Sequence, residues 1–279
     1  MEQKKKFKIG MCLFENYHQR KDIGSSRIRG HWIIEELNKQ GHDAECFIQG
    51  SDYDVVVYQK CYWKEHMRAF KGLKILDICD PDWLDGAEIV SILKEIDIVT
   101  VSSERLKEDL EKFSDKPVHV ISDGVKKKKS VKKHTGRAKK ICWFGYSGNL
   151  SLIEPALVKI KKLGLTLKII SDGNFNTSVC KVENIKWDIE TVEDEMLECD
   201  MCLLPDGLMG RFLYKSQNKT YESWSLGLPV VKTPDDLERF MEDDERGLES
   251  EFRLKEVDAK YLVKNSAKKL IEIICQKKK

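Results

Sequence analysis

The sequence lacks any apolar run of 18 residues, so we expect no membrane-spanning helix. Among its nine cysteines, Cys199 and Cys202 have the C-x-x-C spacing only by count, because on a strand they would point to opposite faces. We therefore expect buried, reduced thiols and no cysteine metal or redox site. No secretory leader with an apolar core opens the chain, which favours a cytoplasmic location.

What the chain does contain is typical of a soluble protein with two modest cores. Its 279 residues are 41% hydrophobic and 34% charged. The net charge of +2 conceals a local excess of positive charge, because the segment from Lys126 to Lys140 holds nine Lys or Arg residues. Lysine clusters also lie at both ends of the chain. Such basic segments are usually solvated, but they could also grip nucleic-acid phosphates.

Short apolar stretches alternate with amphipathic helical patterns, which predicts two α/β domains with parallel sheets. The alternation stops within the polar segment 124–140, so we predict an N-terminal domain at 1–125, a basic linker at 126–139 and a C-terminal domain at 140–279. The expected strands are 7–14, 44–49, 54–59, 74–79, 96–101, 118–122, 140–144, 167–171, 185–187, 201–204 and 230–232. The expected helices are 26–40, 63–70, 87–95, 104–112, 152–163, 192–199, 219–226 and 259–276.

The segment between Pro205 and Pro229 carries the strongest functional signal. A helix could begin near Ser216 or Asn218, which are good N-caps, and would end by Gly227. Lysine in a first helical turn opposes the helix dipole, so a bound anion would explain its presence. Lys215, Lys219 and Glu222 share one helical face, and the glutamate could accept hydrogen bonds from hydroxyls. Phosphate beside ribose fits this pattern.

Four segments, in this order, resemble the GT-B glycosyltransferases, most closely the large retaining family of nucleotide-sugar enzymes (family 4). They are GSSRIRG with the following helix, VISDGV, KKICWFGYSGN, and LLPDG followed by YKSQNKTYESWSLGLPVV. The resemblance implies two Rossmann-like domains facing a cleft. It also implies transfer of a sugar from a nucleotide donor, for example a UDP-sugar, to an acceptor hydroxyl, with retention of configuration. No metal or other cofactor is implied, because basic groups and helix dipoles neutralise the leaving diphosphate.

Carried over to this sequence, the resemblance assigns a role to each part of the candidate site. Glu222 matches the glutamate that holds the ribose hydroxyls. Gly145 and Gly148 would let a backbone loop approach the diphosphate closely. Gly24 and Ser25 would lie across the cleft, on the acceptor side. The residues matching the diphosphate segment are Lys215, Ser216, Asn218 and Lys219.

The chain also departs from this pattern at two positions. Tyr214 stands where the family has the first glutamate of a Glu-x7-Glu pair, so the sugar contact would be lost, altered or supplied by Asp206. Cys79-Asp80 stands where a His-Asp pair often occurs, which leaves Asp80 as the candidate catalytic residue. Arg27 and Arg29, at a helix start, could meet a phosphate or an acidic acceptor, or lie on an exposed face.

Several functions remain open at this level. The acceptor could be a glycan, lipid or protein, or a hydroxymethylated base in DNA, which would make use of the basic linker and the lysine-rich ends. A non-catalytic nucleotide or nucleotide-sugar binding module is the alternative from another class, because the first glutamate and the histidine are missing. A dinucleotide-dependent oxidoreductase has less support, because GYSGNL matches only part of the G-x-G-x-x-G pattern.

Overall fold

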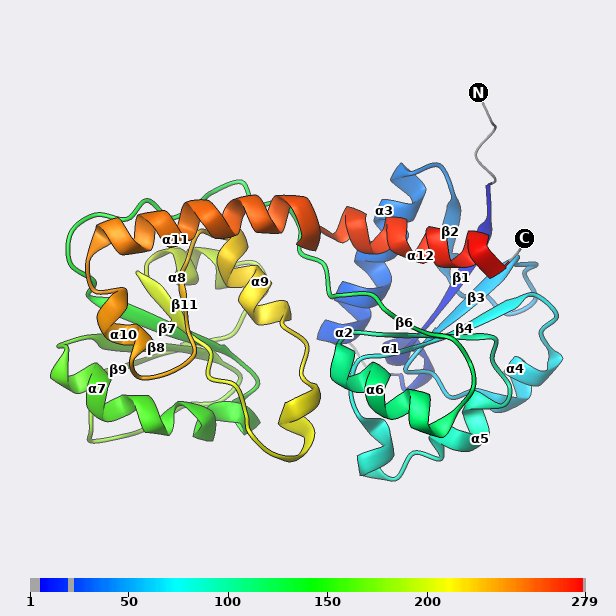
Figure 1. Cartoon of the computed structure of the whole chain (residues 1–279), viewed down its shortest axis with the longest axis horizontal. Coiled ribbons are helices and arrows are strands. Elements are labelled where there is room, and N and C mark those ends of the chain that lie inside the picture. The colour runs from blue at the N-terminus through cyan, green and yellow to red at the C-terminus, as the bar shows by residue number, and fades with distance from the viewer. Residues whose placement is uncertain (1–5, 20–22, 278–279) are drawn as a thin grey trace. The chain divides into compact units, whose positions relative to one another are not determined.

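The computed structural model describes residues 6–19 and 23–277, and the chain divides into two compact units (Figure 1). Unit 1 comprises Met1–Lys126, Met209–Asn218 and Tyr261–Lys279, and unit 2 comprises Lys127–Leu208 and Lys219–Lys260. The segment expected as a linker therefore lies almost entirely in unit 2. The outermost lysines of both termini lie outside the described residues.

Unit 1 is built on a sheet of six parallel strands with the order β2-β1-β3-β4-β5-β6. The strand runs are short and almost wholly buried, as in Val55–Gln59, because helices cover both faces of the sheet. The strands are β1 (Lys8–Leu13), β2 (Asp43–Cys46), β3 (Val55–Gln59), β4 (Leu73–Ile78), β5 (Ile98–Val101) and β6 (Val118–Val120).

Each face of this sheet has its own apolar core. On one face, α3 (Trp32–Lys39) and α12 (Val263–Lys277) pack side by side over the sheet. On the other face lie α4 (Lys64–Ala69), α5 (Ile89–Leu93) and α6 (Glu104–Phe113). The shorter elements of the unit are α1 (Phe14–Tyr17), α2 (Gly24–Ser26), a π-helical turn at Arg27–His31 and 3₁₀ turns at Asp82–Asp85 and Gly210–Tyr214.

Unit 2 contains a second parallel sheet, with the order β11-β10-β7-β8-β9. Its strands are β7 (Lys140–Gly145), β8 (Thr166–Ser171), β9 (Val182–Lys186), β10 (Met201–Leu203) and β11 (Val230–Val231). Its helices are a 3₁₀ segment (Ser147–Ala156), α7 (Leu157–Lys162), α8 (Val192–Leu197), α9 (Asn218–Ser225), α10 (Asp236–Arg239), α11 (Asp243–Glu256) and a π-helical turn at Val257–Tyr261. The fold class predicted from the sequence, α/β with two parallel sheets, is confirmed.

Helix α11 was not expected from the sequence, because its buried face is polar. Arg246 and Ser250 are buried, whereas Leu248 and Phe252 are 66% and 60% exposed. The guanidinium of Arg246 donates to the carbonyl oxygens of Gly136, Phe240 and Met241, which satisfies its donors. A search for apolar residues at helical spacing cannot find a helix of this kind.

The strand order shows where each sheet has its reversal point, the place at which successive strands switch from one side of the first strand to the other. In unit 1 the chain moves outward on both sides of β1, so this point lies between β1 and β3. In unit 2 it lies between β7 and β10. Ligands of open α/β sheets bind outside the carboxyl ends of the strands at these points. The residues to inspect therefore follow Leu13, Gln59, Gly145 and Leu203.

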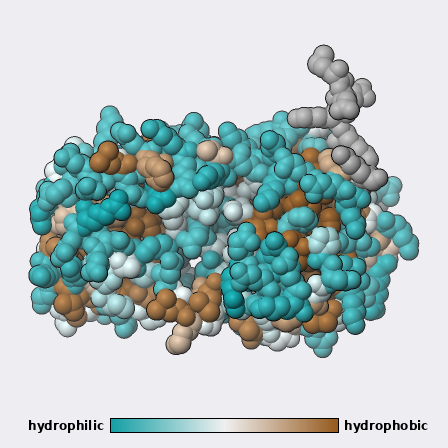
Figure 2. All heavy atoms as spheres, in the orientation of Figure 1, coloured by the Kyte–Doolittle hydropathy of each residue, from teal (hydrophilic) through white to brown (hydrophobic). Residues whose placement is uncertain are grey.

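The surface and the helix lengths complete the description. The face drawn in Figure 2 is mostly hydrophilic, with scattered apolar residues. Among the described residues, no helix combines the length and apolar character needed to span a bilayer. Nor do three or more His, Cys, Asp or Glu side chains of residues 6–19 and 23–277 gather as a metal site would require.

Candidate functional site

Gly145 and Lys219 meet at the carboxyl end of β7, next to the point where the strand order of unit 2 reverses. Gly145 has a φ of +143°, a conformation that favours glycine. A Cβ atom added there would overlap the Nζ atom of Lys219, so the ammonium group lies directly against the glycine. The same Nζ atom lies 5.1 Å from the ring centre of Trp143. Two residues that the sequence assigned to one ligand, 74 positions apart, are therefore adjacent.

The loop after β7 is held by the loop that follows β8. Ser147 donates its backbone N–H to Asp172 at 2.7 Å, and the Ser171 hydroxyl donates to the carbonyl of Gly145 at 2.7 Å. The hydrogen bond from Ser147 is the main reason that the pKa of Asp172 is lowered. At Gly148, a Cβ atom would meet the ring of Tyr146, itself 68% exposed. Hydrogen bonds to the loop after β8 thus hold the loop after β7, which carries the exposed ring of Tyr146.

Glu222 lies one helical turn beyond Lys219 and forms an ion pair with Lys128 from the basic segment. Lys128 also pairs with Glu193 at 2.7 Å, and its side chain is only 4% exposed. Burial opposes protonation of Lys128, but Glu222 and Glu193 outweigh it, so the pKa of Lys128 is raised. Lys128 therefore stays protonated beside Glu222. The side chain of Glu222 is 16% exposed.

The start of α9 divides the predicted diphosphate segment. The helix begins at Asn218, one of the two N-cap positions considered, and only Lys219 of the two lysines lies in its first turn. Lys215 and Ser216 precede the helix and group with unit 1. The Nδ2 atom of Asn218 is buried and has no hydrogen-bond partner among the residues that the structure describes.

Asp206, the predicted substitute for the sugar-binding glutamate, follows β10. Its carboxylate accepts a hydrogen bond from the Nζ atom of Lys232 at 2.8 Å. The Asp206 side chain is 59% exposed, so this pair is solvated. Its assignment to the sugar stays a prediction.

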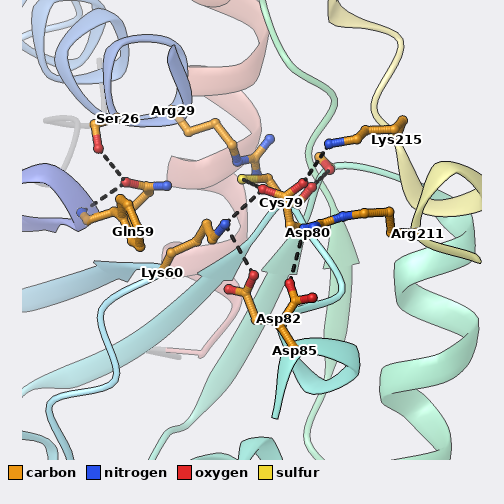
Figure 3. A network of polar contacts seen from close by, with 12 residues as sticks. Ser26, Arg29, Gln59, Lys60, Cys79, Asp80, Asp82, Asp85, Arg211 and Lys215 are labelled. Carbon is orange, nitrogen blue, oxygen red and sulfur yellow. Dashed lines mark hydrogen bonds and ion pairs between the residues drawn. The ribbon is translucent and has the colours of Figure 1, made fainter. Parts of the chain in front are cut away.

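In unit 1, Asp80 lies in a cluster of charges at the carboxyl ends of β3 and β4 (Figure 3). Its Oδ2 atom accepts from Lys60 at 2.8 Å, and its Oδ1 atom accepts from Lys215 at 3.2 Å. Lys60 also contacts Asp82 at 3.2 Å, and Asp82 accepts a 2.5 Å hydrogen bond from Tyr62. Both oxygens of Asp80 are thus engaged by lysines.

The electrostatics of this cluster keep Asp80 ionised. Burial opposes ionisation, but Lys60 and Lys215 outweigh it and lower the pKa of Asp80. A general base works best when its pKa lies near the working pH, so this direction is unfavourable for proton abstraction. Lys60 itself has a φ of +49°, which is unusual for a residue with a side chain. A left-handed backbone conformation at a strand end is typical of functional sites.

Tyr214 fixes the segment 209–218 to unit 1. Its hydroxyl donates to Asp109 at 2.5 Å, and its ring packs edge-on against Trp83. The residue is 7% exposed. Arg211 pairs with Asp85 at 3.1 Å in the same segment. The side chain at the position where the sequence resemblance expects a glutamate is therefore an anchor within unit 1.

Gly24, Ser25 and Arg27 are all partly buried, near the start of the long helical segment. The better-defined polar groups of this region are Ser26 and Gln59, where the Ser26 hydroxyl donates to the Oε1 atom of Gln59 at 3.1 Å. Gln59 is fully buried at the end of β3, and its Nε2 atom has no partner among the described residues. An acceptor group from a ligand or water would satisfy it.

Arg29, which the sequence left open as a contact for an anion or an acidic acceptor, is instead a structural residue. It is 6% exposed and forms a two-pronged ion pair with Asp77, at 2.8 and 2.6 Å. Its third nitrogen donates to Asp123 at 2.6 Å and to the carbonyl of Ile121 at 2.8 Å. The ion pairs join the strands of unit 1 and leave the guanidinium enclosed.

The basic segment at 126–139 is neutralised locally to a large extent. Many of its basic side chains form ion pairs. The pairs are Lys126 with Glu35, Lys127 with Asp258, Lys128 with Glu193 and Glu222, Lys132 with Asp200, and Arg137 with Glu242. Much of its positive charge is therefore neutralised by acidic residues of the protein. This weakens the hypothesis that the segment binds the phosphates of a nucleic acid.

Sequence reasoning missed Lys60, Gln59 and Lys128. A polar residue that ends the apolar run VVVYQ could have pointed to Gln59. Lys128 has no such signal, because it stands within four consecutive lysines. Only the three-dimensional contacts separate it from its exposed neighbours.

No protein-family model matches the sequence, and no curated protein matches it significantly. Solved structures do match. An α-glucosyltransferase (AGT) in complex with UDP aligns over 96% of this chain and 100% of its own, with 10% identity and a TM-score of 0.72. An α-glucosyltransferase in complex with UDP and a 13-mer DNA containing a HMU base aligns over 97% and 100%, with 10% identity and a TM-score of 0.68. The chain has the GT-B fold.

Some of the solved structures that match this chain are longer. TarM aligns over 86% of this chain, with 13% identity and a TM-score of 0.59, and the chain spans 57% of the length of TarM. At 10–13% identity these likenesses concern the fold alone. Within the fold, the carboxyl edge of the second sheet holds Gly145, Lys219 and Glu222, and the carboxyl edge of the first sheet holds Asp80.

Proposed function

We propose that this protein is a glycosyltransferase that takes a sugar from a nucleoside diphosphate sugar, with UDP as the first nucleotide to test. The observation that carries the proposal is the contact between the Lys219 ammonium and Gly145, at the reversal point of the second sheet. A cation, a glycine that lets a backbone approach closely and a helix N-terminus together suit a diphosphate. Structures bound to UDP are among the solved structures that share the fold.

In this proposal the donor is bound by α9 and the loop after β7. Lys219 stabilises the diphosphate as the sugar leaves, and Gly145 with Gly148 provides the close backbone approach. Glu222, one turn along α9, accepts hydrogen bonds from the ribose hydroxyls. Lys215, Ser216 and Asn218 complete the diphosphate segment, and Asp206 is the candidate contact for the sugar. The buried, unpaired amide nitrogen of Asn218 is suited to donate to a ligand oxygen.

The acceptor side is proposed to lie on unit 1, at the carboxyl ends of β1, β3 and β4, near Gly24, Ser25 and Arg27. Asp80 was predicted to be catalytic, and that role stays a prediction. The two lysines on its oxygens favour a different task, in which Asp80 holds Lys60 and Lys215 in place. Retention of configuration, independence of metal and membership of family 4 are proposed from the sequence resemblance.

For the acceptor, the local neutralisation of the basic segment favours a hydroxyl on a glycan, lipid or protein. A hydroxymethylated DNA base is the second candidate, supported by the similarity to the α-glucosyltransferase bound to UDP and DNA. Salt dependence separates the two, because phosphate contacts release counterions and give a steep decrease of affinity with salt. A steep slope with duplex DNA would favour the base.

The experiment for the proposed reaction is a panel of nucleotide sugars, incubated with the protein and assayed for released nucleoside diphosphate. We expect slow hydrolysis of one donor, which K219M abolishes because the leaving diphosphate loses its cation. K161M, in the same unit on α7, is the control and should hydrolyse the donor at the wild-type rate. Saturable binding without any hydrolysis or transfer would instead support the non-catalytic binding module. Absence of binding to every donor would refute the proposal.

A further inference from the structure

Lys128 is the buried member of a run of four lysines. Its side chain is 4% exposed, whereas that of Lys127 is 77% exposed. Removing an ammonium from water is costly unless it is paired and hydrogen-bonded. Lys128 meets this requirement through Glu193 at the start of α8 and Glu222 on α9. The segment between β6 and β7 therefore places a cation next to Glu222, the proposed ribose-binding residue.

The partners of Lys128 differ in their surroundings. Glu193 is 47% exposed and is solvated in its own right. Glu222 is 16% exposed, so water reaches its carboxylate less readily and the neighbouring cation matters more to it. The Nζ atom of Lys128 donates to the Oε1 atom of Glu222. A carboxylate has about four acceptor positions on its two oxygens, so it can take part in an ion pair and accept hydrogen bonds from a ligand as well.

We propose that Lys128 is a positioning residue for the nucleotide ribose: its ion pair orients the carboxylate of Glu222 so that it accepts hydrogen bonds from the ribose hydroxyls. The inference rests on the proposed function, because it assumes that Glu222 binds ribose. Glu193 also pairs with Lys128, so the lysine keeps a second partner that holds it in place when the nucleotide binds. The consequence is specific, because only ligands with ribose hydroxyls should sense Lys128.

The test compares UDP with 2′,3′-dideoxy-UDP by calorimetry on the full chain. The wild type should bind UDP roughly 10- to 100-fold more tightly, the range expected for hydrogen bonds to a charged group. K128M should lose most of this preference while its affinity for the dideoxy ligand stays within about twofold of the wild type. K128R should restore most of the preference, and K127M is the matched control from the exposed neighbouring lysine.

Three results overturn the inference. One is a wild-type preference for UDP in K128M. The second is an equal loss of affinity for both ligands in K128M, which indicates damage to the fold rather than loss of ribose recognition. The third is a wild type that binds both ligands equally, which refutes the ribose role of Glu222; a wild type that binds neither ligand would instead contradict the proposed function. If K128M does not fold, K128Q removes the charge with a shorter polar side chain, and the same outcomes apply.

Discussion

Replacing Gly145 by alanine should weaken nucleotide binding, whereas a glycine-to-alanine change of similar backbone strain elsewhere should lower only the free energy of unfolding. The added Cβ atom would overlap the Nζ atom of Lys219, which is the far end of a flexible side chain. The lysine can therefore rotate away, and the clash itself costs little stability. The backbone conformation, with φ at +143°, adds a strain of about 1–3 kcal/mol for a residue with a side chain.

The effect on binding follows from the displaced charge. Two unit charges interact by about 4 kcal/mol at a separation of about 4 Å with an effective dielectric constant of about 20. If Lys219 retreats to about 8 Å from the diphosphate, this attraction falls by about 2 kcal/mol. That difference corresponds to a loss of roughly 30-fold in affinity for UDP.

The assay for Gly145→Ala is calorimetric titration with UDP, combined with urea unfolding to measure the free energy of unfolding. Gly164→Ala is the matched control, because Gly164 also has a positive φ, of +71°, with open space around the position of a Cβ atom. The control should lose a similar free energy of unfolding and keep its affinity for UDP. If G145A binds UDP as tightly as G164A, the placement of Lys219 at the diphosphate is refuted.

Three further predictions concern unit 1. Arg29→Met should reduce the free energy of unfolding by about 3–5 kcal/mol, because it leaves two buried aspartates without their cation. Arg211→Met removes an exposed ion pair and should cost less than about 1 kcal/mol. Equal losses in urea unfolding would contradict this prediction. The pKa of Asp80 is lowered, so its charge stabilises the folded protein above the ordinary aspartate pKa of about 4, and this contribution is lost as the pH falls below that value. Asp80→Asn should therefore show a smaller decrease of Tm in acid than the wild type. Parallel plots of Tm against pH for the two proteins would contradict this. Tyr214→Phe should cost about 1–2 kcal/mol in urea unfolding through the lost hydrogen bond to Asp109, and an unchanged midpoint would show that Tyr214 is no anchor.

The sequence predicted the strands well because both sheets are parallel and buried on both faces. Each expected strand is present, with bounds shifted by at most a few residues, since a short apolar run ended by polar residues is a direct consequence of that environment. Helix α11 was missed for the opposite reason. Its buried face contains Arg246 and Ser250, which donate to backbone or pack in place of apolar residues.

The candidate site was predictable where local chemistry is unusual. A lysine in a first helical turn pointed to Lys219, and the resemblance to GT-B glycosyltransferases pointed to Gly145. Long-range ion pairs were not predictable, because any of several lysines could meet Glu222 and only the fold selects Lys128. Arg29 shows the same limit, since its aspartate partners lie 48 and 94 positions away.

The central claim is that α9 binds the nucleotide of a sugar donor through Glu222. The most direct measurement is the affinity for UDP of the wild type and of Glu222→Ala, by calorimetry, with the unfolding midpoint of each measured in parallel. We predict saturable binding by the wild type and at least a roughly tenfold loss in the variant, with the fold retained. Equal affinity for UDP in a folded Glu222→Ala variant would contradict the claim.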